Sequence, residues 1–231
     1  GDQFVLGSTL FCLNRPGSEP SAAGELPLQE VTFDAQTIRQ IHFRDADRQM
    51  EVLMHLPEVI SGSRTDDDLF FRLTSLLLAG VSQAEAVGVV RVTNGDKVEL
   101  TNWTRRHEAA GEFRPSSRLV MESLKRKCSV LHLWPASSPQ NPEYTAAAEL
   151  DWAFCTPVTE GPQATWGLYV AGKQSHPLAN GNSPANETAH LQADVKFTEL
   201  VSEIISSVRR LNWLERQQSG LRQFFAPLLG G

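Results

Sequence analysis

The side chains in this sequence that could carry catalysis or bind a metal are few and far apart. The three cysteines, Cys12, Cys128 and Cys155, form no CxxC pair and have no metal-type spacing to histidine. The histidines stand singly, at positions 42, 55, 107, 132, 176 and 190. The sequence contains no HExxH, no GxSxG and no Walker-type glycine loop. We therefore expect reduced, mostly buried thiols, no catalytic residues and no metal site.

Three short runs of charged residues invite a chemical interpretation. Asp66-Asp67-Asp68 resembles a metal cluster, but it follows Thr65, and a capped helix start favours acidic residues without any cation. Lys125-Arg126-Lys127 closes an amphipathic stretch, where basic residues complement the helix dipole. Arg105-Arg106-His107 follows a predicted strand. Its arginines could contact an anionic ligand, and a solvated loop is the alternative.

The overall composition is that of a chain with a buried core. Among 231 residues, 41% are hydrophobic and 21% are charged, which excludes a disordered polymer, a collagen and a full-length coiled coil. The net charge of −6 disfavours nucleic acid as a partner, because an acidic surface repels phosphates. No apolar run approaches the ~20 residues that a membrane span needs, and there is no export signal. These features predict a cytoplasmic protein.

The first 45 residues differ from the rest of the chain. Residues 1–13 alternate apolar and polar side chains around a glycine, which predicts a β-hairpin. Residues 14–45 begin with a stretch rich in proline, glycine and serine, which predicts a linker. The hairpin is too short to be stable alone, so it belongs either to a neighbouring domain or against the main one.

Residues 46–190 show helical and strand patterns in succession, which predicts one domain. The expected helices cover residues 46–60, 65–79, 113–127 and 146–150, and the expected strands cover 86–92, 97–103, 129–134, 152–159 and 165–171. Asn94-Gly95 is a strong hairpin signal between the first two strands. This order predicts an α+β fold with a central antiparallel sheet of five or six strands, helices on one face and a long C-terminal helix.

The C-terminal helix, expected over residues 191–220, carries a heptad pattern of apolar side chains. Successive members are spaced 4, 3, 4 and 3 residues apart: Phe197, Val201, Ile204, Val208 and Leu211. Leu200 and Ile205 form a second apolar stripe. Because one stripe can cover the domain while the other meets a second copy, we expect a parallel homodimer through this helix. At ~1.5 Å per residue the helix is longer than a small domain needs, so it should project.

Several segments resemble the GAF domain, a small-molecule sensor fold of signalling proteins. Trp152–Gly172 is similar to the family's paired strands, in which a "P-V" strand and a "G-x-L-Y-V" strand recur. Ser117–Leu131 resembles the family's helix and its following strand. The resemblance covers roughly residues 46–215 and implies a regulatory domain without catalytic activity.

The two ends resemble parts of other signalling domains. Gly1–Leu13 is similar to the closing strands of a forkhead-associated (FHA) domain, and Leu221–Leu229 is similar to the segment that leads into class III adenylate and guanylate cyclase domains. Residues 221–231 are therefore expected to begin a linker to an output domain. Together these segments imply an FHA–GAF–adenylate cyclase protein in which this domain modulates cyclic-nucleotide synthesis. The alternatives are a dimerisation spacer with a filled pocket, or the GAF module of a transcription activator, histidine kinase or diguanylate cyclase.

The GAF resemblance also implies a ligand between one face of the sheet and its overlying loop. The residues expected to border that space are Trp103, Arg105, Trp134, Tyr144, Trp152 and Cys155. The alternative is that these aromatic side chains simply fill the core. Cys155 is either a redox sensor or a small hydrophobic residue. The cyclic-nucleotide motif of phosphodiesterase GAF domains and the bilin-attachment Cys-His pair are missing, and no haem motif is present, so the cofactor stays unknown.

Overall fold

The fold is built on one six-stranded antiparallel sheet, with a separate two-stranded sheet at the N-terminus. A computed structural model describes residues 2–6, 9–13, 29–33, 43, 45–93, 97–107, 113–134, 150–160, 163–173 and 184–229. Within these ranges, the side chains of residues 2–29, 160–165, 184–188, 212–213 and 215–229 are not described. The expected helix over 146–150 and the Asn94-Gly95 turn lie outside the described residues.

The large sheet has the strand order β3-β6-β7-β8-β4-β5. The strands of the whole chain are β1 (Asp2–Leu6), β2 (Thr9–Leu13), β3 (Gln29–Thr32), β4 (Ala84–Thr93), β5 (Lys97–Arg105), β6 (Val130–Leu133), β7 (Trp152–Glu160) and β8 (Gln163–Gly172). The predicted N-terminal hairpin is confirmed, because β1 and β2 pair antiparallel from Asp2↔Leu13 to Leu6↔Thr9. The upper expectation of six strands for the main sheet is also confirmed.

The sixth strand comes from the region that the sequence predicted to be linker. β3 pairs antiparallel with β6, with Glu30 opposite His132 and Val31 opposite Leu131. Its four residues show too little pattern to be recognised, and pairing with β6 is what gives the segment its strand conformation. The sequence prediction for residues 14–45 is therefore wrong over β3, and this strand forms one edge of the sheet.

Side-chain caps set the beginning of two of the described helices. They are α2 (Ala46–Gly62), α3 (Asp66–Gly80), α4 (Ser117–Arg126) and α5 (Pro184–Leu229). The Thr65 hydroxyl accepts from the backbone N–H of Asp68 at 3.2 Å, which confirms the predicted cap of α3. Ser116 caps α4 in the same way through the N–H of Leu119, at 3.4 Å. Lys127 ends α4 with a φ of 55°, in the left-handed region.

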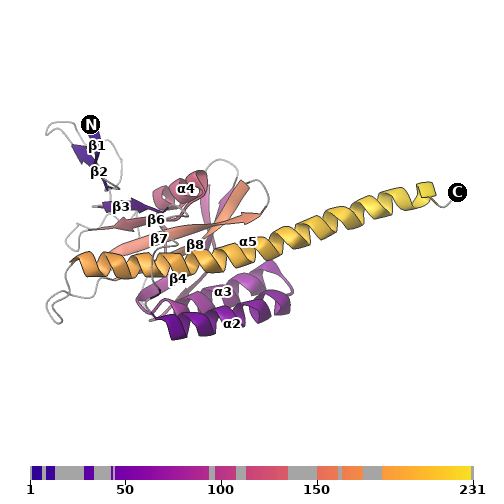
Figure 1. Cartoon of the computed structure of the whole chain (residues 1–231), viewed down its shortest axis with the longest axis horizontal. Helices are drawn as coiled ribbons and strands as arrows, with labels where there is room; N and C mark the ends of the chain where they lie inside the picture. The colour runs from indigo at the N-terminus through magenta and orange to yellow at the C-terminus, as the bar shows by residue number, and fades with distance from the viewer. Residues whose placement is uncertain are drawn as a thin grey trace.

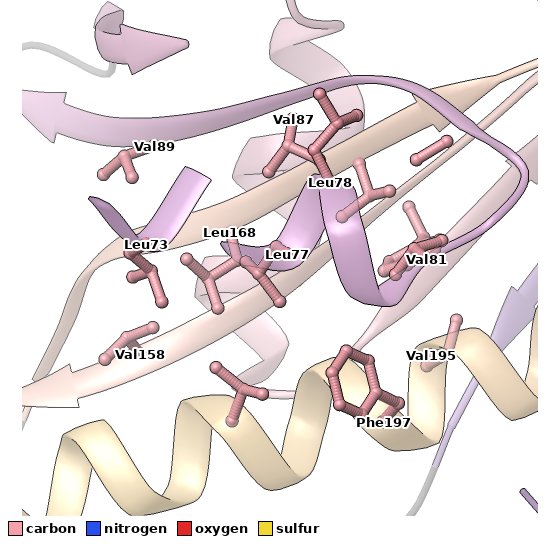
Figure 2. Close-up of a cluster of buried hydrophobic side chains, with 14 of the residues drawn as sticks. Leu73, Leu77, Leu78, Val81, Val87, Val89, Val158, Leu168, Val195 and Phe197 are labelled. Carbon is pink, nitrogen blue, oxygen red and sulfur yellow. The ribbon is translucent and has the colours of Figure 1, made fainter. Parts of the chain in front are cut away.

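Helices α2, α3 and α5 lie against one face of the sheet and enclose the larger apolar core. Figure 2 shows Leu73, Leu77 and Leu78 of α3 in the same cluster as Val195 and Phe197 of α5. α3 and α5 approach closely at Gly80, where a Cβ would lie 2.7 Å from the Phe197 ring. These side chains are almost fully buried, so this face holds most of the hydrophobic stabilisation.

The opposite face is covered by α4 and holds a second, smaller apolar cluster. Helices were expected on one face only. The structure shows α2, α3 and α5 on that face and adds α4 on the other (Figure 1). Below, "the α4 face" means the side of the sheet that faces α4. Its side chains belong to the second cluster and are those of Ala86, Val90, Val130, Ala153, Cys155, Tyr169 and Ala171.

Helix α5 is far longer than the domain that it covers. Its 46 residues correspond to about 70 Å at ~1.5 Å per residue. The helix crosses the body of the domain and then continues well beyond it (Figure 1), as the sequence predicted. Across the helices that the structure describes, none combines the length and apolarity needed to cross a membrane.

Candidate functional site

The α4 face is set by strict alternation along β7 and β8. Ala153 and Cys155 of β7 point toward α4, together with Tyr169 of β8. Trp152 and Phe154 point to the opposite face, where their rings stack at 6.0 Å and an interplanar angle of 7°. Residues an odd number apart on a strand cannot share a face, so β7 contributes to two separate cores.

Polar groups fasten α4 to this face. The backbone N–H of Ser116 donates to the Tyr169 hydroxyl at 3.2 Å. The Ser123 hydroxyl lies 2.9 Å from the carbonyl oxygens of both Cys128 and Cys155. Burial raises the pKa of the Tyr169 phenol well above its usual value. The α4 face is therefore held by neutral hydrogen bonds as well as by apolar contact.

Aromatic and cationic side chains meet at the β5 side of the α4 face. The Trp103 and Phe113 rings lie 5.9 Å apart. The Arg105 guanidinium lies 5.1 Å from the Trp103 ring centroid and 5.6 Å from that of Phe113. This is cation–π geometry, and Trp103 remains 41% exposed. An arginine between two rings at a partly open edge suits a flat or anionic ligand.

The remainder of the Arg105-Arg106-His107 segment is engaged within the protein. Arg106 Nε donates to the Ala84 carbonyl at 2.9 Å, and Nη2 donates to the Leu78 carbonyl at 2.6 Å. His107 Nδ1 lies 2.9 Å from the Glu85 carboxylate. Arg106 therefore ties the end of α3 to β4, and only Arg105 of the three side chains lies against the aromatic pair.

At the β3 side of the same face, three potential metal ligands converge. Glu30 of β3, Glu122 of α4 and His132 of β6 place one ligand atom each within 4.8 Å of the others. His132 Nε2 lies 3.5 Å from Glu30 Oε2 and 3.7 Å from Glu122 Oε2. The His132 side chain is only 1% exposed, and its ring meets Trp134 edge-on at 5.9 Å. We call these three residues the Glu–Glu–His cluster.

Two arginines border the Glu–Glu–His cluster from the solvent side. Arg126 Nη2 lies 2.6 Å from Glu122 Oε1, and Arg126 Nη1 lies 3.5 Å from Glu30 Oε1. Arg118 Nη2 lies 3.8 Å from Glu30 Oε2. The His132 contact, more than any other, lowers the pKa of Glu30. Burial and the neighbouring Glu30 carboxylate raise the pKa of Glu122. The two carboxyls thus differ strongly in their affinity for a proton.

The fold that carries these sites has known structural relatives. A GAF domain from a phosphoenolpyruvate-protein phosphotransferase of Coxiella burnetii superposes with a TM-score of 0.50 and 11% identity, over 76% of this chain and 99% of that chain. The chain has the GAF fold. Sequence comparison adds no family: no family model matches the chain, and no curated protein does.

Two further structures are similar in fold to this chain. The GAF domain of A. aeolicus nlh2 gives a TM-score of 0.47 and 9% identity, over 72% of this chain and 99% of that chain. The free methionine-R-sulfoxide reductase of Neisseria meningitidis gives 0.46 and 14%, over 72% of this chain and 96% of that chain. At these identities the likeness concerns the fold alone, because one fold hosts many functions.

The GAF fold distributes the predicted pocket residues unevenly. Trp103, Arg105 and Cys155 belong to the α4 face or its β5 edge, and Trp134 lies beside the Glu–Glu–His cluster. Trp152 does not join them. It is fully buried in the other core, and its indole N–H donates to the Lys173 carbonyl at 3.1 Å. The odd spacing between positions 152 and 155 already required this separation. Tyr144 lies outside the described residues.

Cys155 behaves as a small hydrophobic residue in this GAF fold. Its side chain is fully buried, and burial raises the pKa of its thiol to about 12. A thiol that stays protonated is a poor nucleophile, which argues against a redox or nitrosation sensor at this position. Burial also raises the pKa of Cys128, the other cysteine whose side chain the structure describes.

Sequence reasoning missed the Glu–Glu–His cluster because its members come from three elements. Glu30 falls in the predicted linker, and Glu122 has the pattern of an ordinary charged residue on an amphipathic helix. One signal was available, since His132 interrupts the apolar run Ser129–Trp134 at a position that should face a core. A polar residue in a buried strand needs a partner, and the two glutamates are what the fold brings to it.

Proposed function

We propose that this chain is the regulatory, non-catalytic sensor and dimerisation domain of a cytoplasmic signalling protein. In this proposal a small molecule acts at the α4 face, and α5 carries the response to an attached output domain. The output that we propose is a class III adenylate cyclase, so that the domain modulates cyclic-nucleotide synthesis. The FHA-like hairpin at β1 and β2 would then belong to a domain that precedes this one.

One observation carries the proposal, which is the change in environment along α5. Phe197 and Val201 are fully buried in the larger apolar core, whereas Leu211 is 61% exposed and Leu214 is 44% exposed. The same helix thus places apolar side chains inside the domain core and, further along, leaves Leu211 and Leu214 in solvent. Exposed leucines on a projecting helix are what a second helix would cover.

The expected dimer seam therefore needs correction in its first half. Phe197 and Val201 belong to the intramolecular core, and Ile204 packs partly against it. A heptad pattern shows that a helix buries one stripe but does not show what covers that stripe. The proposed parallel homodimer would use the distal part of the seam, namely the half-buried Val208 and the exposed Leu211, extended by Leu214.

A paired α5 would connect sensing to output mechanically. The helix contacts β7 through its first half, and its backbone remains helical through the cyclase-linker-like segment Leu221–Leu229. A ligand that prefers one arrangement of the sheet and α4 would shift the population of helix arrangements by its differential affinity. Because class III cyclase sites form between two subunits, as the resemblance implies, the spacing of two such helices would set activity.

Sedimentation velocity tests the dimer that this proposal requires. The double variant Leu211→Glu with Leu214→Glu should sediment as a monomer at concentrations where the unchanged chain is a dimer. The matched control introduces the same charges at exposed apolar positions of α2, through Met50→Glu with Met54→Glu, since these side chains are 57% and 74% exposed. The control should stay dimeric. A dimer that survives the α5 variant, or that only the α2 variant breaks, would refute this function.

The packing of the α4 face favours a second candidate, a dimerisation spacer with a filled pocket. Cys155, Tyr169 and Ala153 are each 0% exposed, so among the described residues the centre of this face is occupied by protein. Both candidates predict the same dimer. A small molecule retained in native mass spectrometry of the purified chain would favour the sensor, and its release by Arg105→Gln would place it at the β5 edge.

A further inference from the structure

We propose that the Glu–Glu–His cluster is a binding site for a divalent transition-metal ion of the Zn²⁺ class. Its ligands would be His132 Nε2, Glu30 Oε2 and Glu122 Oε2. The site is distinct from the aromatic edge at Trp103 and Arg105, and it does not depend on the function proposed above. The sequence alone predicts no metal site, because no two of these ligands lie at a metal-type spacing along the chain.

The positions of the three ligand atoms match a small coordination sphere. In a tetrahedral site with bonds of about 2.0–2.2 Å, ligand atoms are separated by about 3.3–3.6 Å. The His132 Nε2 to carboxylate distances are 3.5 Å and 3.7 Å. All three ligand atoms lie within 4.8 Å of one another, so side-chain movements of about 1–1.5 Å at most would bring them to tetrahedral separations.

The buried histidine is the observation that points independently to a ligand. His132 is 1% exposed, and Nε2 makes no hydrogen bond within the described part of the chain. An unsatisfied buried nitrogen normally costs free energy, so a fold that retains one needs a reason. Both nearby carboxylates direct their Oε2 atoms at Nε2 while their Oε1 atoms face Arg126. A cation between the nitrogen and these two oxygens would satisfy all three.

Arg126 fits the role of an outer partner to the proposed metal ligands. Metal-binding carboxylates are commonly hydrogen-bonded through the oxygen that does not bind the ion, and Arg126 occupies that position on Glu122 at 2.6 Å. The Arg126 and Arg118 side chains are 49% and 46% exposed, so solvent screens their charges from the ion. Arg126 therefore orients the ligands without excluding a cation, whereas Arg118 Nη2 lies 3.8 Å from the proposed ligand atom Glu30 Oε2 and has to turn away when the ion binds.

The ligand types favour a first-row ion over calcium or magnesium. One imidazole with two carboxylates is a borderline donor set, and Zn²⁺ binds such sites more tightly than Mn²⁺ or Fe²⁺. Three protein ligands would leave one position open to water or to an oxygen of a small molecule. Because the ligands come from β3, α4 and β6, a bound ion would also tie the edge strand to the helix that covers this face.

Isothermal titration of the chelator-treated chain with Zn²⁺ tests the proposal. We expect one ion per chain, and Glu122→Gln should weaken binding by at least about 100-fold, beyond the 10–100-fold that loss of an outer partner costs. Glu122 sits on α4 at 17% exposure and the substitution preserves its shape, so this variant should fold. His132→Gln should abolish binding. If that variant fails to fold, Glu30→Gln supplies the second test.

A matched control uses an exposed histidine–glutamate pair on α2. His55 and Glu58 of α2 lie 3.8 Å apart and are 59% and 84% exposed, so His55→Gln with Glu58→Gln should leave Zn²⁺ affinity unchanged. Titration with Co²⁺ should give a visible d–d spectrum without a thiolate charge-transfer band. Absence of saturable binding, binding that survives Glu122→Gln, loss of binding in the α2 control, or a thiolate band that assigns the ion to cysteine would each overturn the proposal.

Discussion

The two halves of α5 both carry apolar side chains, but these side chains lie in different environments. From Leu191 to Ile205 most apolar side chains are buried among those of α2, α3 and the sheet, and Leu200 and Ile204 are half-buried. Beyond Val208, Leu211 and Leu214 lie in solvent, and the heptad register shifts between them. The difference teaches that the spacing of apolar residues along a helix indicates which side chains form one face. It does not indicate what covers that face. Whether the domain or another chain buries it depends on where the sheet ends beneath the helix.

Polar contacts also hold the buried half of α5 in place. On the buried half, the Ser202 hydroxyl donates to the Pro157 carbonyl at 2.6 Å, and the Ser206 hydroxyl accepts from the Thr159 N–H at 3.0 Å. Arg209 pairs with Asp66 at 3.1 Å, and its guanidinium lies 5.5 Å from the Trp166 ring centroid. These contacts fix α5 to β7 and to the start of α3, close to the position where the helix leaves the domain.

The largest expected effect is on the free energy of unfolding, which alanine substitutions in the two halves of α5 should change by different amounts. Phe197→Ala removes a fully buried ring from the core, so we expect a loss of about 3–5 kcal/mol in the free energy of unfolding. Leu211→Ala at 61% exposure should change the monomer by no more than about 0.5 kcal/mol. Urea unfolding at concentrations below dimerisation measures both. Equal losses in the free energy of unfolding at Phe197 and Leu211 would contradict the difference in burial between the two halves.

A smaller expected effect is a pH dependence of stability caused by Glu199, on the buried half of α5. Burial raises the pKa of Glu199, although Ser129 hydrogen-bonds to its carboxylate. The carboxyl group of Glu199 therefore binds its proton more tightly in the native state than in the unfolded state. As a result, the protein loses stability as pH rises from about 4.5 through the raised native pKa. Glu199→Gln cannot ionise, so its stability relative to the unchanged chain should rise over that interval and then level off. Thermal unfolding at a series of pH values measures this. A constant difference between the two proteins across the series would show that Glu199 is not buried as described.

Much of the fold was predictable because local chemistry decides it. Thr65 and Ser116 cap α3 and α4 as their sequence positions suggest. The β-branched run in β4 and the paired pattern of β5 form adjacent antiparallel strands. In these segments propensity, capping and apolar period agree, so a single sequence suffices.

The candidate sites were less predictable because tertiary contacts create them. β3 becomes a strand only by pairing with β6, and that pairing places Glu30 opposite His132. No local pattern encodes this approach. The misplacement of Trp152 has a different origin, since strand alternation was sufficient to separate it from Cys155. The predicted dimer seam was wrong at Phe197 and Val201, which lie in the core of the domain. A heptad spacing does not specify which surface covers the apolar residues.

Hydrogen exchange along α5, measured at low and high protein concentration, tests most directly whether the two halves have different partners. Amides from Val195 to Ile205 should be equally protected at both concentrations, because the domain core covers them. Amides around Leu211 and Leu214 should gain protection only at the higher concentration, where a second copy covers them. Distal amides whose protection is the same at both concentrations would contradict the account.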